Sequence, residues 1–286
     1  PAGSSYRVTP FALMKGFRLA GSRDGVKPIV VLEGSWSIAE GSYLSSLEFD
    51  NIEFRHEANN NYFMNTSKAY TIENVSFVNC DFISLRRGFW RHQSANAKYI
   101  MNLEMEGCRF EGCGWQTSAY GAFNLQSFDK DNGVSYDQVD RAIFRNCTFS
   151  NDNDGTNGYG WGTLFYAPYM DKPIDLEYKN VTIYNYSRNQ RLINIESAVG
   201  SKLVMEGILL ASPCGDLFAI GANTTTTFSN NYTTADYTLG GKNMNATDLK
   251  ITAAELFADP ANGDLTIKDT SSPIVSNRAG DTRWLP

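Results

Sequence analysis

The chain has 286 residues, of which 42% are hydrophobic and 20% are charged, a balance typical of a globular protein and not of a disordered chain. Its formal net charge of −6 argues against a nucleic-acid-binding protein, because such a protein would present a basic face. The longest clean apolar run, Pro28–Leu32, is far shorter than the roughly 20 residues that a membrane span needs. We therefore expect no nucleic-acid partner and no membrane-spanning segment.

Two short apolar segments, 16–21 and 28–34, come first along the chain and predict strands of an early coil. An internal repeat follows, in which alternating apolar residues precede an Asn or Gly, then a small apolar residue, then a large one. Its six copies are 47–54, 75–82, 103–110, 142–149, 176–183 and 203–210. Three steps between the Asn or Gly positions are 27 or 28 residues long, which suits one coil of a parallel β-helix. The steps of 39 and 34 residues predict the same coil with inserted loops.

The repeat has a physical reason at each position. Alternating apolar residues predict a strand with one buried face, and Asn and Gly are the residues that best tolerate a left-handed bend. A small residue fits inside the corner, and a large residue fills the interior. Stacked coils would therefore form one rank that includes Cys80, Cys108 and Cys147, and another of large side chains. The large side chains are Phe54, Phe82, Phe110, Phe149, Ile183 and Leu210.

A second strand is expected after each copy of the repeat. These strands are predicted at 62–65, 88–91, 121–125, 163–166, 191–195 and 216–220. Inserted segments at 110–120, 127–141 and 150–162 predict a loop-rich flank. The repeat is no longer visible downstream of these strands. Residues 252–257 are predicted to form a short helix, and the tail after them is expected to close the open end of the solenoid.

The asparagine-ladder coil resembles the right-handed, single-stranded parallel β-helix of the pectate-lyase-like superfamily. The tail segments 256–268, Ser272-Pro273 and 279–284 resemble the C-terminal signature of poorly characterised bacterial β-helix proteins associated with polysaccharide utilisation. The resemblance implies an all-β fold with an irregular C-terminal cap. We predict one domain over 1–286, with N-terminal coils at 1–46, regular coils at 47–222, and a C-terminal coil and cap at 223–286.

The same resemblance implies a location that is extracellular, periplasmic or on the outer-membrane surface. The chain carries no signal peptide, so an export signal, or a lipid anchor, is expected upstream of it. The resemblance to the pectate-lyase-like superfamily also implies that residues of a lyase site should be recognisable. In such a site carboxylates hold Ca²⁺ and an Arg or Lys removes a proton. Arg86 and Arg87 are present, but no carboxylates align with them. We therefore expect no complete lyase site.

The strongest candidate site is an outward strip on the second strands. If Phe89, Phe123, Ile193 and Phe218 point inward, alternation turns their neighbours outward. The resulting strip contains Trp90, His92, Asn124, Gln126, Asn194 and Glu196, and the inserted loops add Trp115, Tyr120, Tyr159 and Trp161. Tyr166 joins the strip and Tyr169 lies near it, in a coil whose register the pattern does not fix. Aromatic rings with amides and a carboxylate are the groups that bind sugars, although rings that only pack loops would look the same.

The remaining candidates favour ordinary structural roles. The oxygen-rich segment 151–158 offers Asp152 and Asp154 as weak Ca²⁺ ligands, but it fails the EF-hand pattern and an ordinary turn is expected. The five cysteines fit no zinc spacing, so no metal and no cofactor is predicted. His56 and His92 follow different strands, and we expect two exposed strand-end histidines.

These observations predict a secreted or cell-surface protein that binds or presents a polysaccharide or oligosaccharide. Two alternatives stay open: a polysaccharide lyase or glycoside hydrolase that acts on acidic glycans, and a purely structural, adhesin-like solenoid. The ligand is expected across 79–92, 107–126 and 146–169, because loops inserted into a solenoid usually line its functional face.

Overall fold

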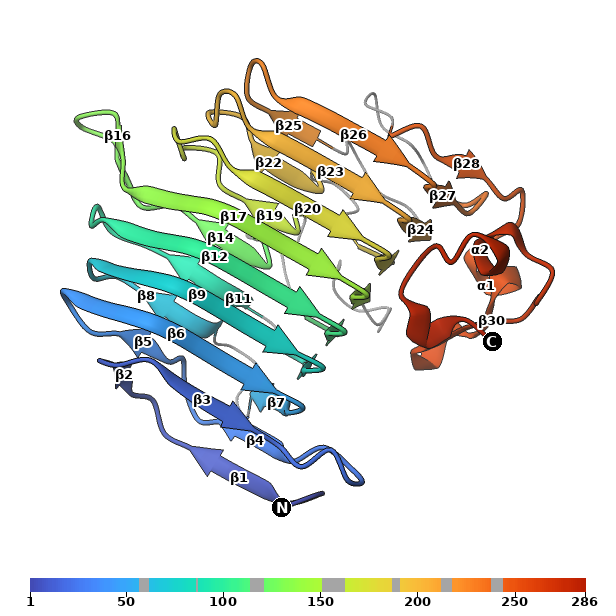
Figure 1. Cartoon of the computed structure of the whole chain (residues 1–286), viewed down its shortest axis with the longest axis horizontal. Coiled ribbons are helices and arrows are strands. Elements are labelled where there is room, and N and C mark those ends of the chain that lie inside the picture. The colour runs from blue at the N-terminus through green and yellow to red at the C-terminus, as the bar shows by residue number, and fades with distance from the viewer. Residues whose placement is uncertain are drawn as a thin grey trace.

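The computed structural model describes residues 1–56, 62–85, 87–113, 121–150, 163–186, 191–211, 218–237 and 244–286. In this part of the chain three long parallel sheets dominate, and the protein is all-β apart from a few short helical turns (Figure 1). From β7 onward the chain visits the ten-, six- and eight-stranded sheets in turn, so neighbours within a sheet come from successive passes. This arrangement is compatible with a parallel β-helix.

Within each long sheet, the order of the strands in space follows their order along the chain. The ten-stranded sheet contains β1 (Ser5–Val8), β4 (Ile29–Leu32), β7 (Glu53–His56), β10 (Asp81–Ile83), β13 (Arg109–Glu111), β18 (Thr148–Ser150), β21 (Thr182–Tyr184), β24 (Leu209–Ala211), β27 (Tyr232–Thr233) and β28 (Thr247–Asp248). The eight-stranded sheet contains β3 (Phe17–Ala20), β6 (Ser42–Asp50), β9 (Tyr70–Val78), β12 (Lys98–Glu106), β17 (Asp137–Arg145), β20 (Asp175–Lys179), β23 (Lys202–Glu206) and β26 (Thr225–Ser229). The six-stranded sheet contains β8 (Tyr62–Thr66), β11 (Gly88–His92), β14 (Phe123–Leu125), β19 (Phe165–Tyr166), β22 (Ile193–Ile195) and β25 (Phe218–Ile220).

Three small sheets complete the described strands. They are the parallel pair β2 (Ala12–Leu13) and β5 (Ser37–Ile38), and the antiparallel pairs β15 (Phe128–Asp129) with β16 (Val134–Ser135) and β29 (Phe257–Asp259) with β30 (Asp264–Ile267). The second strands expected after each repeat are confirmed by the six-stranded sheet. The expected loop 127–141 is wrong as a single loop, because it holds the β15–β16 hairpin and the beginning of β17.

The corner between the eight-stranded and ten-stranded sheets confirms the role of the repeated Asn or Gly. Asn51, Asn79, Gly107 and Asn146 all have positive φ, between 49° and 61°. The Nδ2 of Asn79 donates a hydrogen bond of 2.7 Å to Oδ1 of Asn51 on the neighbouring turn. Next to Gly107, which has no side chain, Nδ2 of Asn146 donates instead to a carboxylate oxygen of Glu106 at 2.7 Å.

The interior confirms the predicted rank of large side chains. Phe54, Phe82, Phe110 and Phe149 are paired in register on β7, β10, β13 and β18. Their successive ring centroids lie 5.4, 4.7 and 4.7 Å apart, and the rings are nearly parallel. The rank is fully buried.

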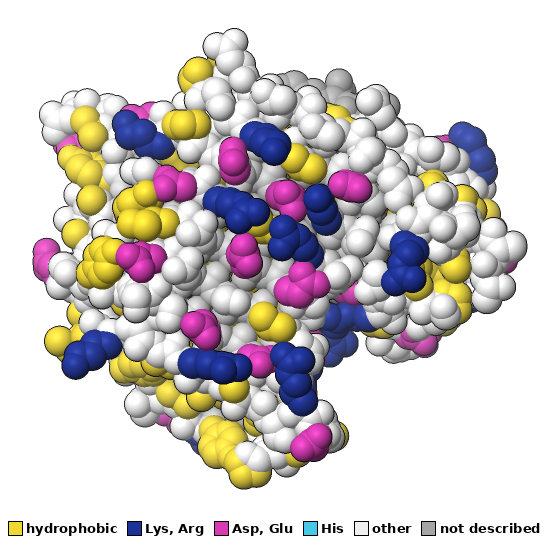
Figure 2. Space-filling model, in the orientation of Figure 1, with side chains coloured by type: hydrophobic (Ala, Val, Ile, Leu, Met, Phe, Trp, Pro, Cys, Tyr) yellow, Lys and Arg dark blue, Asp and Glu magenta, His cyan; other side chains and the backbone are white. Residues whose placement is uncertain are grey.

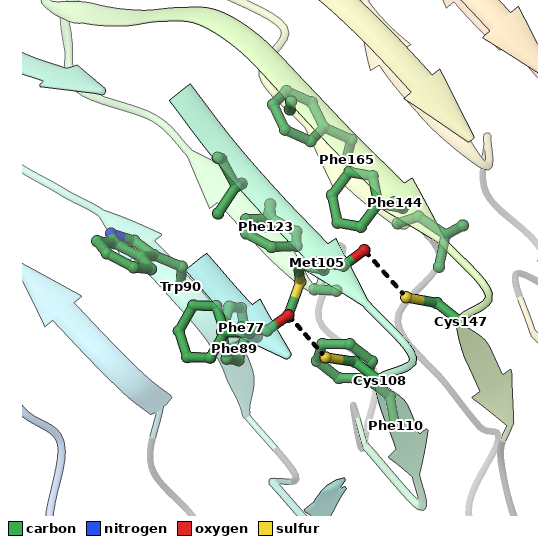
Figure 3. Packing of buried hydrophobic residues seen from close by; sticks show 14 of the residues in the cluster. Phe77, Phe89, Trp90, Met105, Cys108, Phe110, Phe123, Phe144, Cys147 and Phe165 are labelled. Carbon is green, nitrogen blue, oxygen red and sulfur yellow. Dashed lines mark hydrogen bonds between the residues drawn. The ribbon is translucent and has the colours of Figure 1, made fainter. Parts of the chain in front are cut away.

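The predicted cysteine rank lies at the corner of the same core, as expected for small buried side chains. The Sγ of Cys108 donates to the Phe77 carbonyl at 3.4 Å, and Sγ of Cys147 donates to the Met105 carbonyl at 3.6 Å (Figure 3). Burial raises the pKa of the Cys80 and Cys108 thiols, so these groups stay protonated and are poor metal ligands.

The chain beyond β28, residues 249–286, forms what we call the C-terminal arm. It contains α1 (Ala253–Leu256), η1 (Pro260–Asn262), α2 (Pro273–Ser276) and η2 (Thr282–Trp284), together with the β29–β30 pair. The predicted short helix is confirmed as α1, which Thr252 and Glu255 cap reciprocally. The expectation that the tail closes the open end of the solenoid is wrong, because the arm lies along the side of the ten-stranded sheet (Figure 1).

Apolar side chains on the outer face of the last strands explain the position of the arm. Leu209, Ala211 and Tyr232 form a second buried cluster with arm residues such as Leu256 and Phe257, separate from the main core. On earlier strands of the same sheet the corresponding positions are polar, as at Asp81 and Arg109. The arm therefore covers the part of the face that would otherwise expose apolar surface to water.

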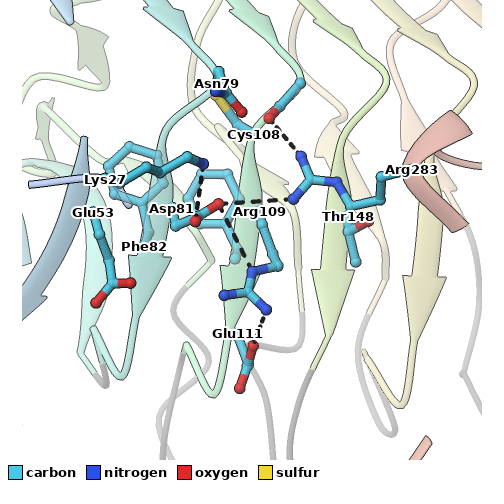
Figure 4. A network of polar contacts seen from close by, with 12 residues as sticks. Lys27, Glu53, Asn79, Asp81, Phe82, Cys108, Arg109, Glu111, Thr148 and Arg283 are labelled. Atoms are coloured by element: carbon cyan, nitrogen blue, oxygen red, sulfur yellow. Dashed lines mark hydrogen bonds and ion pairs between the residues drawn. The ribbon is translucent and has the colours of Figure 1, made fainter. Parts of the chain in front are cut away.

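A polar network extends the contact of the arm toward earlier strands (Figure 4). The Oδ2 of Asp281 accepts a hydrogen bond of 2.7 Å from Oγ1 of Thr148, and the Asp281 N–H donates to Oγ1 of Thr182 at 2.9 Å. The Arg283 guanidinium donates to the Gly107 carbonyl at 2.5 Å and lies 3.7 Å from Asp81. The arm thus links turns of the chain that are far apart in sequence.

Candidate functional site

The register of the six-stranded sheet corrects the predicted strip. Trp90 pairs with Phe123, and Arg91 pairs with Asn124, whereas the prediction aligned Phe89 with Phe123. Trp90 is 1% exposed and His92 is 0% exposed, so the prediction that these two side chains face outward is wrong. Phe89 lies in the core as predicted, with its ring 5.3 Å from that of Phe110, but Trp90 lies in the core as well. The backbone N–H groups of both residues donate to the Ala122 carbonyl, so strict alternation is interrupted here and the residues that follow in β11 are displaced by one position.

The side chains that do face away from the core form one line across five strands, which we call the outward row. Its in-register members are Asn65, Arg91, Asn124, Tyr166 and Asn194. Asn124, Tyr166 and Asn194 were predicted to share this face. Asn65 and Arg91 were missed, although each directly follows a large apolar residue, as Asn124 does.

The amides of the outward row are held in defined positions. Asn124 is fully buried; its Oδ1 accepts from Nε2 of Gln126 at 2.8 Å, and its Nδ2 has no hydrogen-bond partner among the described residues. The Oδ1 of Asn194 accepts from the Glu196 N–H at 3.3 Å. The exposed carboxylate of Glu196 is paired with Arg191, also at 3.3 Å. Gln126, Asn194 and Glu196 therefore lie on the predicted face.

A pair of aromatic rings, one exposed and one half-buried, lies just beyond the outward row. Phe128 and Tyr169 are stacked, with centroids 4.3 Å apart and planes at 14°, and Tyr169 is 37% exposed. Oγ of Ser197 donates to the Pro168 carbonyl at 2.6 Å, so the residue after Glu196 lies beside the residue before Tyr169. We call Phe128 and Tyr169 the ring pair. The sequence pattern missed Phe128, because it follows the strand in an inserted segment.

Arginines occupy the other end of this face. The guanidinium carbons of Arg91 and Arg87 lie 5.4 and 5.6 Å from the centroid of the Tyr62 ring. Such distances allow cation–π attraction, which fixes the positions of the two charges. Arg86 lies outside the described residues.

Other predicted site residues also lie outside the described part of the chain. They are Trp115, Tyr120, Tyr159 and Trp161 of the inserted loops, and the weak calcium candidates Asp152 and Asp154. Among the described residues, no group of three or more His, Cys, Asp or Glu side chains is placed to hold a metal ion. Within the same residues, no helix has the length and hydrophobicity needed to span a membrane.

A buried hydrogen-bond network lies where the six-stranded sheet turns into the eight-stranded sheet. The Nδ1 of His92 lies 2.6 Å from Oδ1 of Asp137, and its Nε2 lies 2.5 Å from the Tyr70 hydroxyl. The other carboxylate oxygen of Asp137 accepts from the Ser127 N–H at 2.6 Å. Lys98 donates to Oγ of Ser127 at 2.6 Å. We call these five residues the corner network.

The corner network is consistent with a neutral His92 that donates to Asp137 and accepts from Tyr70. Burial lowers the pKa of His92, although the Asp137 carboxylate acts in the opposite direction. Burial also lowers the pKa of Lys98, to about 8, and raises that of Tyr70. His92 is fully buried and His56 is 4% exposed, so the expectation of two exposed histidines is wrong. We assign the network a structural role in positioning Ser127, which leads into the ring pair.

The corner network predicts a loss of stability in mild acid. Because the pKa of His92 is lower in the folded chain than in the unfolded chain, its stabilisation is complete above the unfolded pKa of about 6.5 and declines as the pH falls below it. We expect the free energy of unfolding, measured in urea, to fall between pH 7 and pH 5 by at most about 1.4 kcal/mol per pH unit. In His92→Gln this slope should be smaller, although the variant is less stable at pH 7. Equal slopes for both proteins would contradict the assignment.

The long parallel sheets define the class of protein as far as the structure shows it: an all-β chain that repeats one arrangement of strands many times. A family model described as a domain of unknown function (DUF5123) matches residues 176–284. This match begins within β20 and ends at Trp284, so it combines the last turns of the sheets with the C-terminal arm. A search of curated proteins and a search of solved structures gave no match.

Proposed function

We propose that the chain is a right-handed parallel β-helix of the pectate-lyase-like kind, and that it binds polysaccharide on the outer face of its six-stranded sheet. The observation that carries the binding proposal is the ring pair, in which Tyr169 is exposed and Phe128 half-buried, beside the accessible side chains of Gln126 and Glu196. The left-handed corner residues and the repeated order of strands support the β-helix.

The chemistry of this face suits a sugar chain. The apolar face of a sugar ring stacks on an aromatic ring, and its hydroxyls both donate and accept hydrogen bonds, as planar amides do. Tyr169 supplies the exposed ring surface, Gln126 supplies an amide close to it, and Glu196 supplies a carboxylate. The resemblance of the tail to proteins of polysaccharide utilisation supports a location outside the cytoplasm, which is part of the same proposal.

The test is affinity electrophoresis against a panel of neutral and acidic polysaccharides, with wild type and Tyr169→Ala compared on each gel. Loss of one stacked ring should weaken binding by about threefold to tenfold, the equivalent of roughly 0.5–1.5 kcal/mol. The melting temperature should change little, because Tyr169 is 37% exposed and lies outside the main core.

Tyr6→Ala is the matched control, since Tyr6 is 42% exposed but lies on β1 in the ten-stranded sheet. It should bind as wild type does. Binding that is unchanged in Tyr169→Ala, or reduced equally in Tyr6→Ala, would contradict the proposed surface. A lowered melting temperature with unchanged affinity would show that the ring pair only packs the hairpin.

A further inference from the structure

Two tyrosines on the outer face of the eight-stranded sheet repeat one arrangement. Tyr43 on β6 and Tyr99 on β12 are both in register with Thr71 on the strand between them, β9. They therefore lie in one column that crosses the strands. Two strand spacings separate them, which is about 10 Å.

Each tyrosine is anchored in the same way. The Tyr43 hydroxyl donates to Glu73 on the next strand, and the Tyr99 hydroxyl donates to Asp140 on its own next strand. Each acceptor lies two residues beyond the in-register partner of its tyrosine. These bonds raise the pKa of Tyr43 and raise that of Tyr99 to about 12, so both phenols stay neutral.

The anchored rings are accessible and need little further ordering to bind a ligand. Tyr43 is 59% exposed, and Tyr99 is half-buried. A ring that is fixed at its hydroxyl has already lost the rotational freedom that binding would otherwise remove. Two fixed rings at a regular interval are suited to a ligand that presents flat apolar faces at the same interval.

An amide ladder runs beside the rings. Nδ2 of Asn102 donates to Oδ1 of Asn74 at 3.2 Å, and Asn74 donates to the Ser45 carbonyl at 3.3 Å. Asn74 and Asn102 are in register and lie three residues along their strands from the ring column. The face thus combines stacking surface with groups that hydrogen-bond to hydroxyls.

The charges on this face select against an anionic ligand. Acidic and basic side chains are interspersed over the eight-stranded sheet (Figure 2). The anchors of both rings are carboxylates, and Arg141, the cation in register with Asn102, is already paired with Glu104 at 3.5 Å. A uronate or sulfate would meet these carboxylates without a free cation among the described neighbours of the rings.

We propose that Tyr43 and Tyr99 form a second carbohydrate-binding surface, which takes a linear neutral polysaccharide laid across the strands of the eight-stranded sheet. Alternate sugar rings of an extended chain present the same face, so one sugar would stack on each tyrosine and the sugar between them would pass Thr71. This surface lies on a different sheet from the outward row. Evidence against one of the two surfaces would therefore leave the other unaffected.

The experiment measures affinity for barley β-glucan and konjac glucomannan as neutral probes and for polygalacturonate as the acidic probe. We expect binding to at least one neutral probe and a loss of at least about threefold in Tyr43→Ala and in Tyr99→Ala. The double variant should lose at least about tenfold, with an unchanged melting temperature. Tyr99→Phe, which keeps the ring but loses the anchor, should lose less than Tyr99→Ala.

Three outcomes would overturn the inference: no binding to either neutral probe, binding of the double variant within twofold of wild type, or an equal loss in the Tyr6→Ala control. Tyr169→Ala is measured in parallel to separate the two surfaces. If Tyr169→Ala weakens binding and the double variant does not, the inference fails and the proposed function stands. The reverse result supports the second surface and removes the first.

Discussion

Phe110→Ala is expected to lower the free energy of unfolding by about 3–5 kcal/mol, as large cavities in cores do. Phe110 is fully buried, with the rings of Phe82 and Phe149 stacked on its two sides at 4.7 Å each. Phe89 closes a third side, with a centroid distance of 5.3 Å. Rigid strands hold these neighbours at fixed spacing, so the space left by the ring cannot collapse.

Equilibrium unfolding in guanidinium chloride measures this loss, with Phe11→Ala as the matched control. Phe11 is 40% exposed and contacts the main core from outside, with its ring 4.7 Å from that of Trp36, so its replacement should cost clearly less than that of Phe110. If Phe110→Ala cost less than about 1 kcal/mol, the stack would not be the centre of the core and the register of β10, β13 and β18 would be in doubt.

Asp281→Ala is expected to destabilise the protein by about 2–4 kcal/mol and to release the C-terminal arm. The Asp281 carboxylate is 2% exposed, accepts from Oγ1 of Thr148 and pairs with Nε of Arg283 at 2.9 Å. Removal of the carboxylate leaves a buried hydroxyl and a mostly buried guanidinium without this partner. The indole of Trp284, which donates to the same Thr148 oxygen at 2.7 Å, would lose its fixed acceptor geometry.

Limited trypsin digestion reports release of the arm directly, since Lys268, Arg278 and Arg283 lie within it. Asp281→Ala should be cut there faster than wild type. Asp269→Ala is the control, because Asp269 is exposed and bonds only locally, to Ser271. Equal digestion of Asp281→Ala and wild type, together with unchanged stability, would show that the apolar contacts alone hold the arm.

The repeat could be predicted from the sequence because its determinants are local. Asn51 and Asn79 bend the chain through their own backbone, and Phe82 or Phe110 fills the space one turn encloses. The register of β11 could not be predicted in the same way. Phe89 and Trp90 are adjacent and large, and both lie in the main core, so a rule of strict alternation misplaces the residues that follow them.

The position of the C-terminal arm depends on contacts with strands that are far away in the sequence, but one sequence pattern indicated that those strands are covered. Leu209, Leu210 and Ala211 are three successive apolar residues, a run typical of a strand that is buried on both faces. The structure shows Leu210 in the main core and its two neighbours under the arm. Phe128, in the ring pair, gave no such signal, because nothing in the repeat marks the end of an inserted hairpin.

The most direct test of glycan binding on the outer face of the six-stranded sheet is a hydrogen–deuterium exchange footprint, taken with a bound oligosaccharide from the polysaccharide that binds most tightly. The backbone that carries Gln126 and Phe128, and the turn that carries Tyr169, should become protected when the ligand is added, while the C-terminal arm should not change. Tight binding that protects only the arm, or that leaves both of these segments unchanged, would contradict the account.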